Sequence, residues 1–144
     1  MNDEKFILKA ISLAKKASKK GDFPVGAIVV KNNKIISSSF NKKENKKNAT
    51  YHAEILAIKK ACKKLKTWRL DDCILYTSME PCLMCYGAII QSRIKKLVFS
   101  IANESFGAIT LYKNSKIKYE IIHNEEYLKI IKQFFKLKRI QSKK

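Results

Sequence analysis

Two short stretches, His52-Ala53-Glu54 and Pro81-Cys82-Leu83-Met84-Cys85, decide how the rest of the chain is interpreted. Each stands where a helix is expected to begin. Cysteines three residues apart lie on one face of a helix, so two thiolates can hold one metal ion. The free N–H groups and the dipole at a helix N-terminus favour the thiolate form. His52 adds a nitrogen ligand from the other helix, which predicts a zinc site.

The number of ligands separates a catalytic zinc site from a structural one. A structural site is closed by four protein ligands, whereas a catalytic site keeps one position open. Cys62 lies about 15 Å from His52 along one helix, Cys73 stands at the far end of a strand about 16 Å long, and His123 stays open as a fourth ligand. With three ligands, bound water gives hydroxide near neutral pH. Glu54 is then available to transfer protons, so the site is predicted to be catalytic.

A C-x-x-C pair alone also fits a redox dithiol. Thioredoxin-like folds usually place a proline opposite the dithiol, and this chain has only Pro24 and Pro81, which favours the metal. Cys62 and Cys73 are interpreted as packing residues. A single histidine or glutamate has an ordinary structural explanation, and only the combination in this order indicates a site.

The length and composition indicate an ordered, single-domain protein. A length of 144 residues suits one domain, residues 1–144, and a hydrophobic fraction of 46% excludes a disordered chain. No stretch approaches the roughly 18 to 20 apolar residues of a membrane-spanning helix. The N-terminus begins with acidic residues and has no apolar segment of the secretory type, which predicts a cytoplasmic protein.

The net charge of +19 predicts a polyanionic partner, most simply nucleic acid. The basic residues are 28 lysines and 3 arginines. Such a bias also follows from genome base composition, which scatters lysine over any solvated surface. Charge alone therefore does not identify the partner.

Hydrophobic periodicity predicts an alternation of helices and strands. Helices are expected over residues 3–20, 50–65, 82–92 and 125–140, and strands over 25–30, 35–39, 73–77, 97–99 and 117–122. Asn32-Asn33 tolerates positive φ and predicts a hairpin between the first two strands. Residues 41–49 are polar and lysine-rich and are expected to form a loop. The pattern indicates an α/β domain with a mixed sheet covered by helices.

The chain resembles the bacterial tRNA-specific adenosine deaminases of the cytidine and deoxycytidylate deaminase superfamily. The H-x-E…P-C-x-x-C signature is common to zinc deaminases that act on bases. The stretches that carry the resemblance are Gly21–Ala27, Phe40-Asn41, His52–Glu54, Trp68–Leu70, Leu75–Thr77, Glu80–Cys85, Gly87-Ala88, Ser92–Ile94 and Phe134-Phe135. The resemblance implies a three-layer α/β/α fold with about five strands.

The same resemblance implies the chemistry and the substrate. His52, Cys82 and Cys85 would hold one Zn²⁺ per subunit, and Glu54 would move protons between the water and N1 of adenine. The product would be inosine at the wobble position of a tRNA anticodon, usually that of an arginine tRNA. The family is homodimeric, so a homodimer bound to a tRNA anticodon stem-loop is expected.

Further residues are expected to contact the substrate. Asn41 would contact the target nucleotide, and Val25 and Ala27 would line the pocket that receives the flipped base. RNA loops are bound by stacking and phosphate contacts, which the C-terminal helix would supply through Phe134, Phe135, Lys138 and Arg139. Core packing is an equally good explanation for at least one of the two phenylalanines.

The resemblance weakens at three places. Asn103 stands where the family usually has an aspartate, Tyr51 replaces a small residue before His52, and the loop over 104–118 is short. These positions border the nucleic-acid channel in the family, so substrate choice stays open. A zinc deaminase of a free base or nucleoside, of the cytosine or guanine type, is the first alternative. A non-catalytic, zinc-stabilised RNA-binding protein is the second.

Overall fold

An antiparallel hairpin at one edge of a five-stranded sheet organises the first half of the protein. The computed structural model describes residues 2–112 and 116–142. The hairpin joins β1 (Gly26–Lys31) to β2 (Lys34–Phe40). Asn32 and Asn33 at its tip have φ of 50° and 64°, the left-handed conformation that a two-residue hairpin turn requires and that asparagine tolerates. The predicted hairpin is confirmed.

The remaining strands complete a mixed sheet in the order β2-β1-β3-β4-β5. They are β3 (Cys73–Met79), β4 (Lys96–Ile101) and β5 (Lys118–Ile121). β1 is antiparallel to both β2 and β3, whereas β3, β4 and β5 are parallel. Parallel neighbours need crossover connections, which contain α3 (Leu83–Gln91) and α4 (Ala108–Tyr112).

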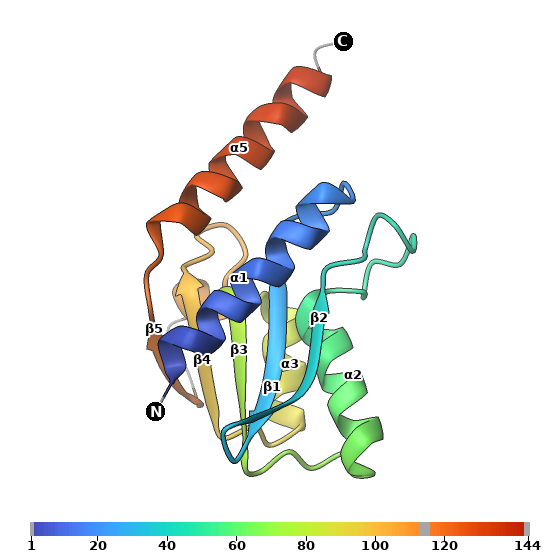
Figure 1. Cartoon of the computed structure of the whole chain (residues 1–144), viewed down its shortest axis with the longest axis vertical. Helices are drawn as coiled ribbons and strands as arrows, with labels where there is room; N and C mark the ends of the chain where they lie inside the picture. Colours follow the sequence, from blue (N-terminus) through green and yellow to red (C-terminus); the bar gives the residue numbers. More distant parts are fainter. Residues whose placement is uncertain (1, 113–115, 143–144) are drawn as a thin grey trace.

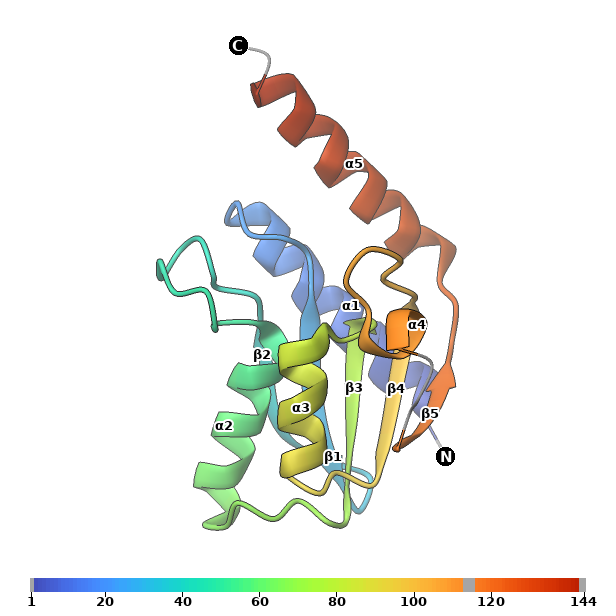
Figure 2. The same ribbon diagram turned by 180° about the vertical axis from the view of Figure 1, so that it is seen from behind.

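Helices cover both faces of this sheet (Figures 1 and 2). One face packs against α1 (Asp3–Lys19) and the beginning of α5 (Glu125–Ser142), and the other against α2 (Ala53–Leu65) and α3. Gly26 permits the close contact between β1 and α1, because a Cβ there would lie 2.1 Å from the Ala10 carbonyl oxygen. The expected three-layer α/β/α architecture is confirmed.

Side chains alternate between the two faces of the sheet along each strand, so they form two hydrophobic cores, one on each face. Ile28 and Val30 of β1 point to the α1 side, whereas Ala27 and Val29 point to the α2 and α3 side. The second core also takes Cys73 and borders Cys62, which agrees with the interpretation of both as packing residues. The predicted helices and strands are all present, with ends shifted by a few residues.

Two features differ from the sequence expectation. The short helix α4 was not predicted, because five residues are too few to show a helical repeat. The second difference is the burial of α5. Tyr127 and Ile131 are buried, but Phe135, Leu137 and Ile140 are about half exposed. Phe134 and Phe135 still pack on Phe23, and the C-terminal end of the helix projects from the body of the protein (Figure 1).

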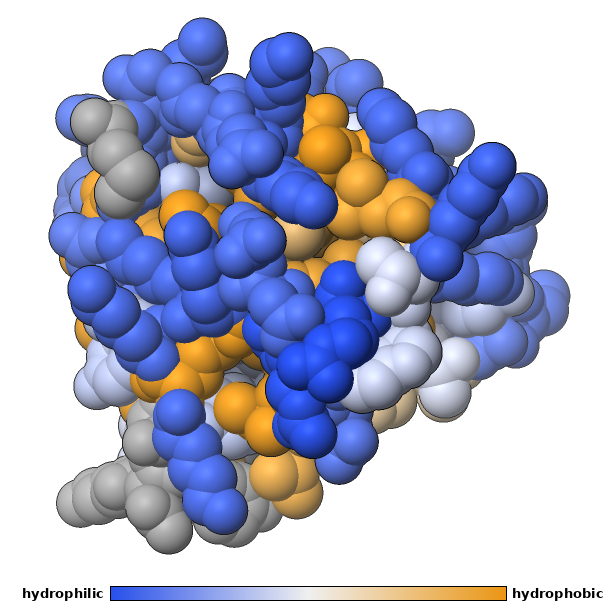
Figure 3. Space-filling view, turned by 90° about the horizontal axis from the view of Figure 1, so that it is seen from below, coloured by the Kyte–Doolittle hydropathy of each residue, from blue (hydrophilic) through white to orange (hydrophobic). Residues whose placement is uncertain are grey.

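The face of the molecule seen from below is mostly hydrophilic. Figure 3 shows hydrophilic side chains around apolar patches on this face. Within residues 2–112 and 116–142, we find no helix with the length and apolar character needed to cross a bilayer.

Candidate active site

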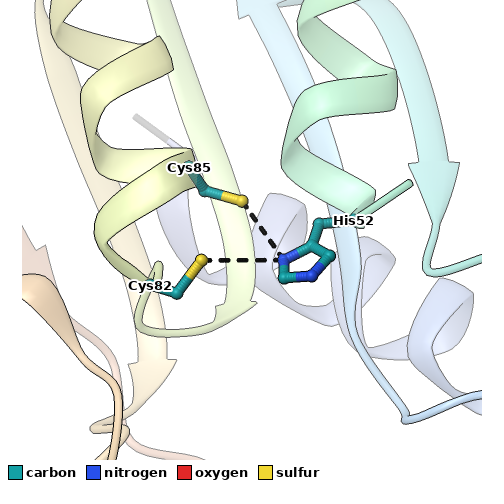
Figure 4. A group of neighbouring side chains, drawn as sticks. All are labelled: His52, Cys82 and Cys85. Atoms are coloured by element: carbon teal, nitrogen blue, oxygen red, sulfur yellow. Dashed lines mark hydrogen bonds between the residues drawn. The ribbon is translucent and has the colours of Figure 1, made fainter. Parts of the chain in front are cut away.

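His52, Cys82 and Cys85 converge between the N-terminal ends of α2 and α3 (Figure 4). The Nδ1 atom of His52 lies 3.6 Å from Sγ of Cys82 and 3.5 Å from Sγ of Cys85. The three ligand atoms all lie within 4.8 Å of one another. Two sulfur atoms and one imidazole nitrogen at these separations form a donor set of the kind that zinc prefers.

Local backbone geometry explains why the three side chains meet. His52 and Cys82 are the N-cap residues of α2 and α3, with extended backbone (ψ of 152° and 174°). Their carbonyl oxygens accept the first helical hydrogen bonds, from Leu56 and Tyr86. Cys85 is one helical turn further on and lies on the same face of α3. The predicted metal ligands are therefore brought together by two adjacent helix beginnings.

The electrostatics of the cluster favour a bound cation. Hydrogen bonds from Cys85 and His52 lower the pKa of the Cys82 thiol to about 4, so that Cys82 is a thiolate at neutral pH. The pKa of Cys85 is raised, first by the hydrogen bond to Cys82 and then by burial. The hydrogen bond to Cys82 raises the pKa of His52, against the opposing effect of burial. One anionic sulfur thus stands beside two further donor atoms.

Glu54 lies beside this cluster. Its side chain is only 4% exposed and lies against the Cys85 side chain. Burial raises the pKa of Glu54 to about 7. Its carboxylate does not belong to the group of three close ligand atoms. A carboxyl group that stands beside the donor set in this way can exchange protons with a small molecule held there.

No fourth protein ligand is present in the described part of the chain, residues 2–112 and 116–142. His123, the alternative left open by the sequence, is exposed and lies 2.6 Å from Glu125 Oε2. Cys62 and Cys73 belong to the second hydrophobic core. The donor set therefore has the three-ligand composition expected of a catalytic zinc site.

The predicted pocket residues lie at the start of β1 and directly after β2. Ala27 is fully buried, and Val25 is partly buried between the two cores. Asn41 is 7% exposed, and its amide group donates to the Phe23 carbonyl oxygen and accepts from the Lys43 N–H. The Asn41 side chain thus holds its own loop in place. Its contact with a nucleotide stays a prediction.

A buried polar network that the sequence did not reveal holds the start of β1 and the residues just before it. The Tyr127 hydroxyl donates to the Pro24 carbonyl oxygen at 2.6 Å and accepts from Ser78 Oγ at 2.9 Å. Ser78 in turn accepts from the Gly26 N–H at 3.1 Å. Tyr127 is fully buried. We call this set the tyrosine network; it joins α5 to the predicted pocket wall.

A second network that the sequence did not reveal holds the loop after β4. Glu80 is 2% exposed and accepts hydrogen bonds from the backbone N–H groups of Asn103 and Thr110, at 3.1 and 2.7 Å. The side chain of Asn103 accepts from the Phe106 N–H, so it closes a turn. The short loop predicted over 104–118 falls partly outside the described residues.

The predicted RNA contacts on α5 form a small aromatic group with the loop before β1. The rings of Phe134 and Phe135 lie 5.4 and 5.3 Å from that of Phe23. Lys138 places its ammonium group 5.5 Å from the Phe134 ring, and Arg139 is exposed. Phe134 is half-buried and packs on Phe23, which itself packs against the first hydrophobic core, so core packing stays an explanation for Phe134. The RNA contacts of both rings stay a prediction.

Comparison with known proteins identifies the family. The model of MafB19-like deaminases matches residues 1–139. A tRNA-specific adenosine deaminase of Aquifex aeolicus is 41% identical over 94% of this chain and 95% of its own length. The chain belongs to the MafB19-like deaminases. It is therefore an enzyme, and its His-Cys-Cys group can bind a metal ion.

Two further relatives bear on this deaminase. A solved structure from a study of A-to-I editing by tRNA:A34 deaminases has a TM-score of 0.82 at 28% identity, covering 89% of this chain and 99% of its own. A guanine deaminase of Bacillus subtilis is 44% identical over 84% of this chain and 78% of its own length. The family thus contains relatives named for an RNA substrate and for a free base.

Proposed function

We propose that this deaminase converts adenosine to inosine at the wobble position of a tRNA anticodon. The observation that carries the proposal is the three-ligand group of His52, Cys82 and Cys85 with the buried Glu54 beside it. The relatives named tRNA-specific adenosine deaminases match nearly the whole chain, including its C-terminal part. We further propose the cytoplasm as its location and an arginine tRNA as its substrate.

The residues of the site divide the reaction between them. His52, Cys82 and Cys85 would hold one zinc ion per subunit, which would supply acidified water as the nucleophile for C6 of adenine. Glu54 would take a proton from the attacking water and deliver it to N1. Glu54 would then carry the proton of the new C6 hydroxyl group to the exocyclic amine, so that the bond from C6 to this nitrogen breaks and ammonia leaves inosine behind. Because Glu54 is buried, bulk water does not compete for these transfers.

The substrate would be held by residues around this centre. Val25 and Ala27 form the wall of the proposed base pocket, and Asn41 contacts the target nucleotide from the adjoining loop. An anticodon loop is single-stranded, so flipping its base is less costly than flipping one from a duplex. Phe134 and Phe135 offer stacking surfaces, and Lys138 and Arg139 offer cations for phosphates.

We also propose that the protein is a homodimer. Leu83 and Met84, which lie between the two cysteines, are 56% and 39% exposed, and Phe106 is 71% exposed. Apolar side chains of this size around a site entrance are characteristic of an interaction surface. Sedimentation of the purified protein tests the assembly, and a monomer at micromolar concentration would contradict it.

A free base is the second candidate substrate. The guanine deaminase of B. subtilis is as similar to this chain as several RNA-acting relatives are. A small neutral base, however, has no need of an exposed aromatic and basic helix. The +19 net charge also fits a polyanionic substrate better. We therefore place guanine or cytosine second.

One assay separates the two candidates. Zinc-loaded protein is incubated with an anticodon stem-loop that carries adenosine at the wobble position, and inosine is measured. Free adenosine, cytosine and guanine are tested in parallel, and Glu54→Ala is the inactive control. Inosine in the stem-loop alone supports the proposal. Ammonia release from a free base, without reaction on RNA, would overturn the substrate and keep the chemistry.

A further inference from the structure

The loop between β2 and α2 gathers lysines beside the active site without ion pairs. Lys42 and Lys46 belong to this loop, Lys20 ends α1, and Lys60 lies on α2. We call these four residues the lysine cluster. Within the parts of the chain that the structure describes, none of the four forms an ion pair with an acidic side chain.

The cluster is convergent, not scattered. The ammonium groups of Lys42 and Lys20 lie 5.1 and 5.9 Å from the centre of the same Phe40 ring. Burial and the positive charges of Lys60, Lys46 and Lys20 lower the pKa of Lys42. Like charges held this close repel one another, so a bound anion would relieve a cost that the free protein carries.

The loop is held in this position by a buried carboxylate. Asp22 is fully buried and accepts hydrogen bonds from the backbone N–H groups of Glu44 and Asn45, at 2.7 and 3.1 Å. The Asn45 side chain also donates to the Lys20 carbonyl oxygen at 2.9 Å. Asp22 thus binds the backbone of the loop, and no ion pair joins it to a lysine within the described residues. The loop and the end of α1 present their cations as one fixed surface.

The cluster adjoins the site but is separate from the metal ligands. The Lys42 N–H donates to the carbonyl oxygen of Tyr51 at 3.0 Å, and Tyr51 directly precedes His52. The same chain segment then continues into α2, whose first turn contains Glu54. Figure 2 shows this loop projecting beyond the N-terminal ends of α2 and α3. A polymer whose one unit enters the site would pass across the loop with its neighbouring units.

We propose that the lysine cluster is a phosphate-binding surface that holds the RNA backbone flanking the reactive nucleotide, separately from α5. The inference rests on the proposed RNA substrate. Phosphates one nucleotide apart match a row of cations better than a single free phosphate does. The Phe40 ring, flanked by Lys20 and Lys42, keeps the two ammonium groups in place through cation–π contacts.

The test compares two variants of equal charge. The cluster variant is Lys20→Gln/Lys42→Gln/Lys46→Gln. The control is Lys34→Gln/Lys63→Gln/Lys64→Gln, whose lysines lie in the hairpin and in the last turn of α2, at the opposite end of the molecule (Figure 1). Thermal denaturation establishes that both are folded. Zinc-loaded proteins are then titrated with an anticodon stem-loop that carries uridine at the wobble position, at several salt concentrations.

The cluster variant is expected to bind roughly tenfold more weakly than the control, with a slope of log K against log salt smaller by about 2. Equal affinities of the two variants, or equal losses, would overturn the inference. So would an equal rise in KM for adenosine monophosphate and for the stem-loop, because the cluster would then act on one nucleotide only.

The binding assay is independent of the proposed function. A wild-type protein that binds the uridine stem-loop through the cluster, yet makes no inosine in RNA, would refute the proposed substrate and leave this surface standing. A protein that makes inosine in RNA, while both variants bind the stem-loop alike, would support the proposed substrate and refute the lysine cluster as a phosphate-binding surface.

Discussion

The catalytic centre and the C-terminal half of α5 are built in opposite ways. Glu54 and Cys85 are buried, and each side chain is held by a neighbouring polar group. Phe135 and Leu137 are about half exposed on the C-terminal half of α5. Under the proposed function, the buried centre would carry the chemistry and the exposed helix would act as a rim that binds the substrate. Substitutions in the two regions should therefore affect different quantities.

The largest effect is expected from Cys85→Ser, which replaces a metal ligand. Zinc content should fall from about one ion per chain to a small fraction, because a hydroxyl is a poor substitute for a thiolate. Deamination should fall to background. Metal content is measured on dialysed protein, with Cys62→Ser, a cysteine of the packing type, as the control. Full zinc occupancy in Cys85→Ser would contradict the assignment of this ligand.

Glu54→Gln should leave zinc in place and remove the proton carrier. We expect kcat to fall by about 10²- to 10⁴-fold, the usual contribution of general acid–base catalysis, with little change in RNA affinity. Single-turnover inosine formation measures the rate, and Glu4→Gln on the exposed face of α1 serves as the control. A weakened RNA affinity with an unchanged rate would show that Glu54 contributes to binding and not to catalysis.

The rim is tested by replacing Phe134 and Phe135 together with alanine. Loss of base stacking is worth about 1–3 kcal/mol per base, so KM for the stem-loop should rise roughly ten- to a hundredfold while kcat is maintained. Leu137→Ala, also exposed on α5 but outside the aromatic group, is the matched control. A fall in kcat without a change in KM would place the two rings in the catalytic centre.

The tyrosine network lies between the two regions, and Tyr127→Phe tests it. The change deprives Pro24 and Ser78 of a buried partner and should lower the free energy of unfolding by about 1–3 kcal/mol. Tyr119→Phe, which removes an exposed hydroxyl, should be neutral. Urea denaturation measures both. Equal stabilities of the two variants would show that the buried hydrogen bonds do not anchor α5.

The smallest effect concerns Asp3, remote from both regions. Burial opposes ionisation of Asp3, but hydrogen bonds from Tyr76 and Lys96 and the Lys96 charge outweigh it and lower its pKa below 3.8. A lowered folded-state pKa stabilises the protein above pH 3.8, and this contribution disappears as the pH falls through the folded-state value. Asp3→Asn should therefore be destabilised at pH 6, and its difference from the wild type should shrink as the pH is lowered, as measured by urea denaturation. A difference that does not change with pH would exclude ionisation as its cause.

The sequence was sufficient for the layers of the fold and for the group of three side chains that could hold a metal ion. The strand and helix patterns each repeat within a few residues, and His52, Cys82 and Cys85 stand in short motifs at helix starts. The tyrosine network was missed because its partners are far apart in the chain: Tyr127 lies 103 positions from Pro24. Glu80 was likewise missed as the anchor of Asn103 and Thr110. Its place beside Pro81 is the only local signal that could have drawn attention to it.

The predicted substrate contacts depend on a partner that the chain does not contain, so sequence and fold leave them as predictions. Asn41 illustrates the limit. Its amide is committed to Phe23 and Lys43 in the folded chain, and only a bound nucleotide would reveal a second role. The single-domain prediction for residues 1–144 also stays a prediction.

The exposure of the last turns of α5 has a consequence for how such enzymes diverge. Leu137 and Ile140 are about half exposed, so substitutions at these positions are expected to cost little stability. New substrates can then be acquired by drift in the last helical turns while the metal-binding motifs stay unchanged. A family that contains relatives named for tRNA and for guanine is the outcome that this separation favours.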